Sequence, residues 1–242
     1  MRTMKILVVN DDSIHAPGIR ELARAAAQLG EVWVVAPSEQ CSAMSQKLTL
    51  RERMGLQKVE GFSEFVREAW QLGGTPVDCV KVALAVVMDE KPDLILSGIN
   101  NGFNVGYDIA YSGTLGAAFE GRRNGIPAIA VSGAGDSQLP AMEPYLVDLL
   151  RELAAQDPGE GAVWNVNFPS MKNREPLGIL RQRVPAPVCM YRESYVPHVL
   201  ADGRVELECR GTPISDESIP VGTDAEAVRK GYISISSVRD VF

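Results

Sequence analysis

Four short apolar segments lack the hydrophobic/polar alternation that would leave one face of a strand in water. They are rich in β-branched residues, which is typical of strands buried on both faces of a sheet. These segments are Lys5–Val9, Val32–Ala36, Asp93–Leu96 and Ala128–Val131. The segments between them have helical spacing, and they are Gly18–Leu29, Val77–Met88 and Thr114–Arg123. This order predicts an α/β fold with right-handed crossovers and a mostly parallel sheet that carries helices on both faces.

The pattern changes in the later part of the chain. An amphipathic stretch at Met142–Ala155 and a strand at Val163–Phe168 complete the alternating region. Pro169–Pro220 is rich in proline and contains short extended runs, which is typical of hairpins and arms. We therefore expect a core over residues 1–168 and a C-terminal extension of β-hairpins over residues 169–242.

The extension contains two extended runs, Ile179–Val184 and Val205–Cys209. Thr223 to Lys230 predicts a short capped helix, and Tyr232–Ser236 predicts a final strand. No run of this extension has an obvious apolar core of its own. Exchange of arms between two chains would bury what one chain cannot bury, so we expect pairing between copies of the chain.

Charge narrows the class of partner. The formal net charge is −7 over 242 residues, without a Lys/Arg run. Long nucleic acids require cationic residues that replace phosphate counterions, so we expect no such partner. A small anionic substrate remains compatible if a bound cation supplies positive charge.

The spacing of the cysteines and the length of the apolar segments indicate the cellular compartment. Cys41, Cys79, Cys189 and Cys209 show no zinc-site spacing, so free thiols are expected. The apolar run near the N-terminus is too short for a signal-peptide core, and no stretch reaches membrane length. We therefore expect a cytoplasmic protein without a membrane partner.

The first strand ends in Asn10-Asp11-Asp12-Ser13, and a helix is expected from about Pro17. In a doubly wound sheet, this places two carboxylates at the edge where ligands bind. Either aspartate taken alone has an ordinary role as a turn or cap residue. Two adjacent carboxylates repel each other unless a cation or hydrogen-bond donors compensate, which favours a metal site.

Further oxygen donors follow the next strands. The Ser38–Ser45 and Ser97–Asp108 loops emerge at the same edge of the predicted sheet as the aspartates. A set of Asp, Asp, Ser and Asn oxygens suits Mg²⁺ or Mn²⁺ and is poor for zinc or copper. Each Ser or Asn taken singly is an ordinary loop residue more often than a ligand.

Ser112-Gly113-Thr114 opens the third predicted helix, after a glycine-rich loop at Gly98–Gly106. Free N–H groups and the positive end of the helix dipole favour a phosphate there, although simple N-capping explains the same residues. The loop matches neither the dinucleotide fingerprint nor the ATPase phosphate loop. His15 and His198 lie far apart in sequence without a nucleophile motif, which disfavours a Ser/His hydrolase.

Taken together, these motifs resemble the survival protein E (SurE) family of nucleotidases, in ordered blocks across nearly the whole chain. The blocks are Asn10-Asp11-Asp12; Ala36-Pro37 with Ser42-Ala43; Gly74-Thr75-Pro76-Val77-Asp78-Cys79-Val80; Ser97-Gly98-Ile99-Asn100 with Gly102, Asn104, Gly106 and Asp108; Tyr111 to Ala118; Gly125 to Ser132; Asn165 to Pro169; Thr223-Asp224; and Gly231 to Ser234.

The resemblance implies a Rossmann-like core and a C-terminal region that exchanges arms in dimers or tetramers. It also implies release of phosphate from nucleoside 5′- or 3′-monophosphates, with polyphosphate trimming in some members. The residues matching the family's ligands to one divalent ion, Mg²⁺ or Mn²⁺, per subunit are Asp11, Asp12, Ser42 and Asn100. We expect catalytic roles for Asp11, Asp12 and Asn100, and phosphate contacts from Asn104, Ser112, Gly113 and Thr114.

Two positions depart from the family pattern. Ser13 replaces the usual glycine after the Asp pair, and Met44-Ser45 replaces the usual small residue and glycine. If the glycine after the Asp pair adopts positive φ, Ser13 adds strain or a local shift there. This raises the alternative of a non-catalytic nucleotide- or metal-binding regulator.

An NAD(P)-linked enzyme is disfavoured because the glycine-rich dinucleotide-binding fingerprint is missing. Attack on phosphorus by water and attack by Asp11 both remain open.

Overall fold

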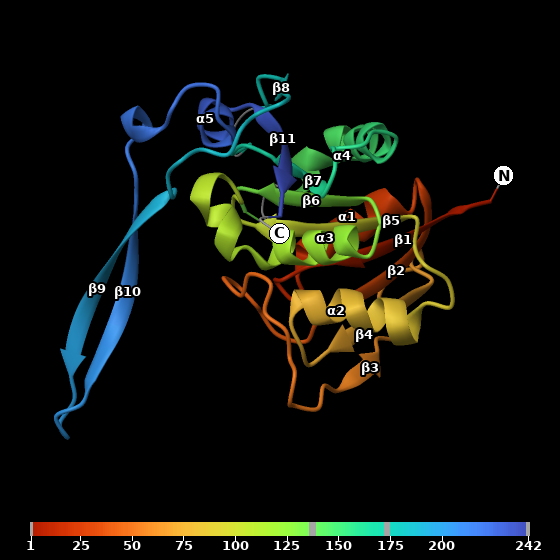
Figure 1. Ribbon diagram of the computed structural model, residues 1–242, viewed down its shortest axis with the longest axis horizontal. Coiled ribbons are helices and arrows are strands. Elements are labelled where there is room, and N and C mark those ends of the chain that lie inside the picture. The colour runs from red at the N-terminus through yellow and green to blue at the C-terminus, as the bar shows by residue number, and fades with distance from the viewer. Residues whose placement is uncertain (1, 136–138, 172–174, 241–242) are drawn as a thin grey trace.

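The structure is a computed structural model that describes residues 2–135, 139–171 and 175–240. A nine-stranded sheet with the order β3-β4-β2-β1-β5-β6-β7-β11-β8 forms its centre (Figure 1). The parallel strands are β4 (Glu68–Leu72), β2 (Gly30–Pro37), β1 (Met4–Val9), β5 (Leu94–Asn101), β6 (Ala128–Gly133) and β7 (Ala162–Asn167). The predicted mostly parallel α/β sheet is confirmed.

Helices cover both faces of this sheet. One face carries α1 (Pro17–Ala26) and α4 (Leu139–Ala154), and the other carries α2 (Pro76–Val82), η1 (Ala83–Val87) and α3 (Gly113–Arg123). Successive strand residues serve opposite faces, so Val8 belongs to the first cluster and Leu7 and Val9 belong to the second. This is why the strands read as uninterrupted apolar runs.

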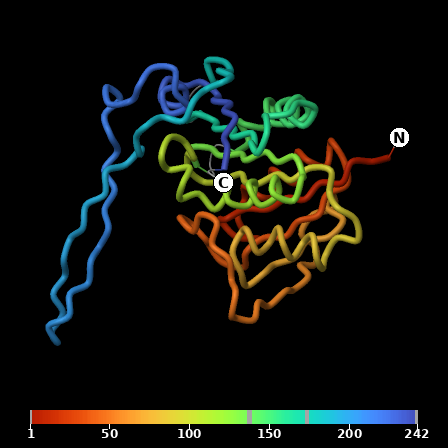
Figure 2. The backbone as a smooth tube through the Cα atoms, in the orientation of Figure 1, coloured from red at the N-terminus to blue at the C-terminus, as the bar shows by residue number. Residues whose placement is uncertain are grey.

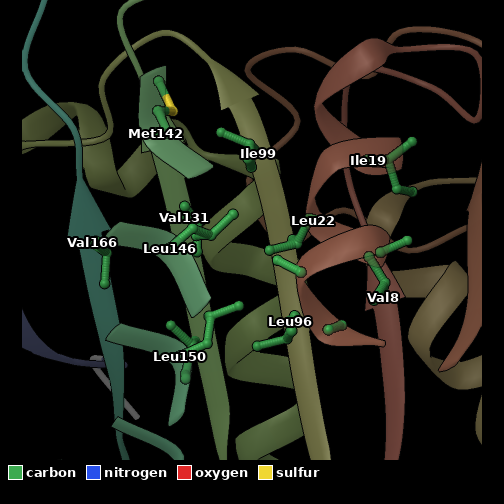
Figure 3. Close-up of a cluster of buried hydrophobic side chains, with 14 of the residues drawn as sticks. Val8, Ile19, Leu22, Leu96, Ile99, Val131, Met142, Leu146, Leu150 and Val166 are labelled. Atoms are coloured by element: carbon green, nitrogen blue, oxygen red, sulfur yellow. The ribbon is translucent and has the colours of Figure 1, made fainter. Parts of the chain in front are cut away.

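The α1/α4 face shows how the layers are held together (Figure 3). Leu22 of α1 and Leu146 of α4 lie against the strand side chains Val8, Leu96 and Val131. None of these five is more than 2% exposed. Full burial of such a side chain stabilises the fold by roughly 1.5–3 kcal/mol. The sheet and its helices therefore form a rigid platform under the loops at the strand ends.

Local signals determine where the helices begin. Pro17 and Pro76 occupy first-turn positions, which need no backbone N–H. Thr75 and Asp78 form a reciprocal capping box at the start of α2. The helix expected at Val77–Met88 is divided into α2 and the π-type turn η1, and it ends where Met88 becomes extended.

The extension of the chain joins the main sheet. β11 (Ile233–Arg239) pairs antiparallel with β7, and β8 (Ile179–Leu180) pairs with β11. At the opposite edge, β3 (Leu56–Lys58) pairs antiparallel with β4. α5 (Asp224–Lys230) begins at the cap Thr223, as the sequence predicts. The boundary at residue 168 stays a prediction, since the sheet itself continues across it.

A long hairpin leaves the body of the molecule. β9 (Tyr191–Val199) and β10 (Val205–Pro213) pair antiparallel along their full length and project outward (Figures 1 and 2). Nearly every residue of both strands is exposed. Two short turns occur as well: η2 (Gly106–Tyr111) lies between β5 and α3, and η4 (Asp216–Ser218) follows β10. Among the described helices, none combines the length and apolar character needed to cross a membrane.

Candidate active site

The carboxyl end of β1 is the switch point of the sheet. β1 lies between β2 and β5, so the chain leaves it toward one side and later returns on the other. Ligands of open α/β sheets bind in the crevice that this reversal creates. Asn10, Asp11 and Asp12 follow β1 directly at this point. The predicted placement of the aspartate pair at the ligand-binding edge is therefore what the topology produces.

Asp11 is 4% exposed and lies against the start of α3. Its Oδ1 accepts a 2.7 Å hydrogen bond from the Thr114 hydroxyl, and the Thr114 backbone N–H also donates to the carboxylate. Burial raises the pKa of Asp11 to about 6, the Thr114 hydroxyl lowers it, and the neighbouring Asp12 charge raises it. A buried carboxylate beside a like charge is a site that a cation would stabilise.

Asp12 is half-buried and is oriented by the end of β5 and by the loop after β2. Its Oδ2 accepts a 2.8 Å bond from the Asn101 backbone N–H, and Gln40 Nε2 lies 3.5 Å from its Oδ1. The same Gln40 nitrogen donates to Ser42 Oγ at 3.0 Å. Gln40 therefore connects two of the four expected metal ligands. Sequence reasoning missed Gln40 and Asn101, because a loop amide and a backbone N–H carry no distinguishing pattern.

Asn100 lies at the end of β5, immediately before the residue that holds Asp12. Its Nδ2 donates to the Gly102 carbonyl at 2.9 Å, so the amide oxygen is the atom suited to a cation. The sheet register shifts between Ser97 and Asn100, which turns this strand end out of the regular ladder. The structure thus brings Asp11, Asp12, Ser42 and Asn100 to one edge of the sheet from three consecutive strand ends.

The donor set fits a hard divalent ion. Within the described residues, no three His, Cys, Asp or Glu side chains are grouped so that they could hold a metal ion. The candidate ligands here are therefore two carboxylates together with neutral Ser and Asn oxygens. Gly113 keeps the space beside them open, because a Cβ at this position would lie 3.0 Å from both Cβ and Oδ2 of Asp11. The ligand roles themselves stay predictions.

The start of α3 lies beside the aspartates, but its hydroxyls are engaged. Ser112 Oγ caps the helix by accepting from Leu115 N at 3.1 Å, and the Thr114 hydroxyl is used by Asp11. Because these hydroxyls are already hydrogen-bonded, the backbone N–H groups of this segment, including that of Gly113, are the donors best suited to contact a phosphate. Thr114 thus orients the Asp11 carboxylate, and its expected contact with phosphate stays a prediction.

Asn104 lies in a buried amide network. Its Nδ2 donates to Ser132 Oγ at 2.8 Å, its N–H donates to Asn167 Oδ1 at 2.8 Å, and its carbonyl accepts from Asn165 at 2.8 Å. These bonds tie the loop after β5 to β6 and β7. The bond to Ser132 uses one of the two Nδ2 hydrogens of Asn104, and the expected phosphate contact stays a prediction.

Asp224 holds the same loop from the C-terminal side. Its Oδ2 accepts from the Gly106 N–H at 3.0 Å, and its Oδ1 accepts from the Ala186 N–H at 2.9 Å. Burial raises the pKa of this carboxyl, whereas these backbone donors lower it. The Thr223-Asp224 pair was visible in the sequence, but only the fold shows that it fixes a loop more than a hundred residues earlier.

The two departures from the family pattern have positive φ. Ser13 has φ 91° and Ser45 has φ 51°, the region that favours glycine. Asn10 Nδ2 donates to the Ser13 carbonyl at 2.8 Å, which fixes the turn after the aspartates. His15 is exposed in this loop, and His198 pairs with Glu208 on the hairpin. The structure therefore does not bring the two histidines together.

An open, doubly wound sheet with an aspartate pair at its switch point defines the class, a Rossmann-like α/β protein whose ligand site is lined by oxygen donors. The family follows from comparison with known proteins. The model of the family "Survival protein SurE" matches residues 6–185, and the chain belongs to the SurE family.

Relatives match over nearly the whole chain. "5'-nucleotidase SurE" of Trichodesmium erythraeum is 38% identical over 98% of this chain and 91% of its own length. "5'-nucleotidase SurE 1" of Thermus thermophilus is 37% identical over 97% of this chain and 91% of its own length. The crystal structure of the SurE protein from Aquifex aeolicus has a TM-score of 0.81 at 33% identity, covering 98% of this chain and 94% of that one.

Proposed function

We propose that this chain is a 5′-nucleotidase, a metal-dependent phosphomonoesterase that releases phosphate from nucleoside monophosphates. The observation that carries the proposal is the Asp11-Asp12 pair at the switch point, with Ser42 and Asn100 at the same edge. Its relatives of similar length are named as 5′-nucleotidases. No feature of the described residues favours the non-catalytic regulator. Activity on 3′-monophosphates and polyphosphate is part of the same proposal.

We infer that one divalent ion, Mg²⁺ or Mn²⁺, binds to Asp11, Asp12, Ser42 and Asn100. When bound there, such an ion would supply charge that polarises a phosphoryl oxygen. Asp12 is pre-oriented for this role by the Asn101 N–H and by Gln40. Both carboxylates must be ionised to bind the ion, so protons compete with it near the pKa of Asp11.

The chain's own residues set up the reacting groups. The Thr114 hydroxyl holds Asp11 in one orientation, facing the phosphate position expected at the start of α3. Backbone N–H groups at Gly113 and the positive helix end would stabilise charge on the phosphoryl oxygens. Asp11 then either orients a water for attack or attacks phosphorus itself.

The decisive experiment is phosphate release from a panel of nucleoside 5′- and 3′-monophosphates with Mg²⁺, Mn²⁺ or EDTA. We expect metal-dependent release that Asp11→Asn abolishes. Asp89→Asn is the matched control, because Asp89 is an exposed carboxylate in a turn between η1 and β5. Absence of release by folded, metal-loaded protein would support the binding regulator instead.

The two routes of attack leave different traces. A phosphorylated Asp11 trapped by rapid acid quench would establish the covalent route. Inversion of configuration at phosphorus in a chirally labelled phosphoester would establish direct attack by water, because the covalent route consists of two displacements and retains the configuration.

We also propose that chains associate through the β9–β10 hairpin into a dimer or tetramer. Its exposed side chains include Tyr195, Val199 and Leu207, which are 63%, 75% and 65% exposed. A single chain leaves these apolar surfaces in water, which favours pairing with a second copy. A monomeric mass by light scattering at working concentration would contradict this.

The cytoplasm is the proposed compartment, supported by the four free cysteines.

A further inference from the structure

A second cavity adjoins the aspartate site and reaches into the C-terminal extension. It has a volume of about 370 Å³, within the range of small-molecule sites. Asn101, Gly102 and Phe103 line its core side, and Met190, Tyr191, Pro213, Arg229 and Ala134 complete its walls. Its wall therefore starts one residue after Asn100 and extends to the base of the projecting hairpin.

One residue connects the cavity directly to the expected metal site. The Asn101 backbone N–H donates to Asp12 Oδ2 at 2.8 Å, and the same residue lines the cavity. The cavity therefore adjoins the place where a phosphate bound at Asp11 and Asp12 would lie. A larger cavity of about 510 Å³ lies along α3 and η2, but no described hydrogen bond links its lining residues to Asp11, Asp12, Ser42 or Asn100.

Two aromatic side chains in the cavity walls, Phe103 and Tyr191, are suited to stack against a flat aromatic ring of a ligand. Phe103 is half-buried, and it packs against the buried cluster that contains Val105, Met190 and Ile219. This support fixes its ring while it lines the cavity. The Tyr191 ring lies over Gly211 on the paired strand, where a Cβ would come within 3.4 Å of Tyr191 Cδ1. Aromatic rings that are held in this way are platforms on which nucleobases stack.

Polar groups occur at the same walls. Arg229 donates to the Ile214 carbonyl at 3.2 Å and lies 3.5 Å from Asp216, which fixes its planar group at the cavity. The Met190 N–H donates to Asp108 Oδ2 at 3.0 Å, so the hairpin base is tied to the loop that follows the metal site. A cavity with rigid aromatic walls and an arginine suits a base with a polar edge.

We infer that this cavity binds the nucleobase of the substrate, with Phe103 and Tyr191 as its stacking residues. The assignment rests on the proposed nucleotidase function and deepens it, because it gives the C-terminal extension a role in substrate choice. Met190, Tyr191 and Arg229 all come from that extension, so base recognition depends on how the hairpin base and α5 meet the loop after β5.

The test compares a nucleotide with the same phosphoester lacking a base. Adenosine 5′-monophosphate and ribose 5-phosphate are the two probes, and Tyr191→Ala is the variant. Loss of a stacking aromatic weakens recognition of the base by roughly 5- to 100-fold. We expect kcat/KM to fall by that factor for the nucleotide and by less than about twofold for ribose 5-phosphate.

A control aromatic lies away from the cavity and from the hairpin. Phe65 is an exposed side chain between β3 and β4 that does not line the cavity, so Phe65→Ala should leave both rates as they are in the unmodified protein. Phe103→Leu keeps an apolar side chain against the buried cluster and should show the same substrate-selective fall as Tyr191→Ala. Equal losses on both substrates, or no loss on the nucleotide, would overturn the assignment.

Binding measured without turnover separates this inference from the proposed activity. Calorimetric titration in EDTA should show tighter binding of adenosine 5′-monophosphate than of ribose 5-phosphate, and Tyr191→Ala should remove the difference. If metal-loaded protein releases no phosphate while this difference persists, the nucleotidase proposal fails and the base site stands. If both probes bind equally to the unmodified protein, the base site is refuted whatever the activity.

Discussion

The hydroxyl of Thr114 donates a 2.7 Å hydrogen bond to Oδ1 of Asp11, joining the first turn of α3 to the end of β1. The bond connects residues that are 103 positions apart in the chain. It opposes the effect of burial on this carboxyl, since it favours the ionised form that a cation needs. Thr114 is therefore a positioning residue for the proposed reaction.

Replacing Thr114 tests this relationship. Thr114→Val keeps the shape of the side chain and removes the hydroxyl, so the pKa of Asp11 should rise further. A hydrogen bond to a charged group contributes about 1.5–3 kcal/mol, so kcat/KM should fall by roughly 10- to 100-fold. The acidic limb of the pH–rate profile should also move to higher pH. Thr114→Ser restores the donor and should recover most of both effects; an unshifted profile in Thr114→Val would contradict this role.

Asp11 should make the metal-free fold less stable at neutral pH. Burial raises its pKa from 3.8 to about 6, so the folded state disfavours the charged form. Stability is therefore lost as pH rises from about 4 to 6 and stays reduced above that window. The shift corresponds to roughly 3 kcal/mol, and Asp11→Asn should recover part of it at pH 8 in EDTA. Denaturant midpoints at pH 8 and pH 4 measure this, and the gain should vanish at pH 4.

The same variant distinguishes the effect of the metal. If Mn²⁺ is the proposed ion, it should raise the thermal midpoint of the unmodified protein with the logarithm of its concentration. Asp11→Asn lacks one ligand and should show little of this rise. An equal rise in both proteins would place the ion elsewhere.

Gly113 should be required for the metal site. In Gly113→Ala the new Cβ would lie 3.0 Å from both Cβ and Oδ2 of Asp11, so the carboxylate must move. We expect Mn²⁺ affinity and kcat/KM each to fall by about tenfold or more. Gly55→Ala is the control, since a Cβ there meets nothing within 4 Å. Unchanged metal affinity in Gly113→Ala, measured by calorimetry, would exclude this contact.

Ser13 should carry backbone strain. Its φ of 91° lies beyond the left-handed helical region, and such a conformation costs a non-glycine residue about 1–3 kcal/mol. Ser13→Gly should therefore stabilise the protein by about 1 kcal/mol after the loss of chain entropy in the unfolded state. Ser13→Ala keeps the strain and should give no gain.

Ser45 offers the contrasting case. Its φ of 51° lies in the ordinary left-handed region, and its Oγ donates to the Ala110 carbonyl at 2.8 Å. Ser45→Gly removes that bond, so its free energy of unfolding should change by less than about 0.5 kcal/mol. A gain at Ser45 equal to that at Ser13 would show that positive φ alone, and not its value, sets the cost.

The core of the fold was predictable because its strands are buried on both faces. β1, β2 and β6 read as apolar runs, which the structure extends by one to three residues. β5 begins one residue later than predicted and continues to Asn101, so the start of the predicted Ser97–Asp108 loop is strand. β4 was missed because its side chains are mostly half-buried, and β9 because both of its faces are exposed. The predicted run Ile179–Val184 forms only the two-residue β8. Such strands are held by backbone pairing, which leaves no hydrophobic period in the sequence.

The candidate site was predictable only as a set of strand ends. The order of motifs placed Asp11, Ser42 and Asn100 at one edge, since parallel strands end together. The partners of those residues could not be predicted. Thr114 holds Asp11 because α3 crosses the sheet at one particular position, and Asn104 is buried because β6 and β7 supply amides to it. Both facts depend on packing between segments far apart in the chain.

The position of β11 in the sheet has a consequence for how the protein is made. Strand β7 pairs on one side with β6 and on the other with β11, which is synthesised long after it. Until β11 leaves the ribosome, the outer edge of β7 has unpaired N–H and C=O groups exposed to water and to other nascent chains. Premature termination within the extension would therefore yield an adhesive, aggregation-prone product, even though every strand of the parallel layer had already been translated.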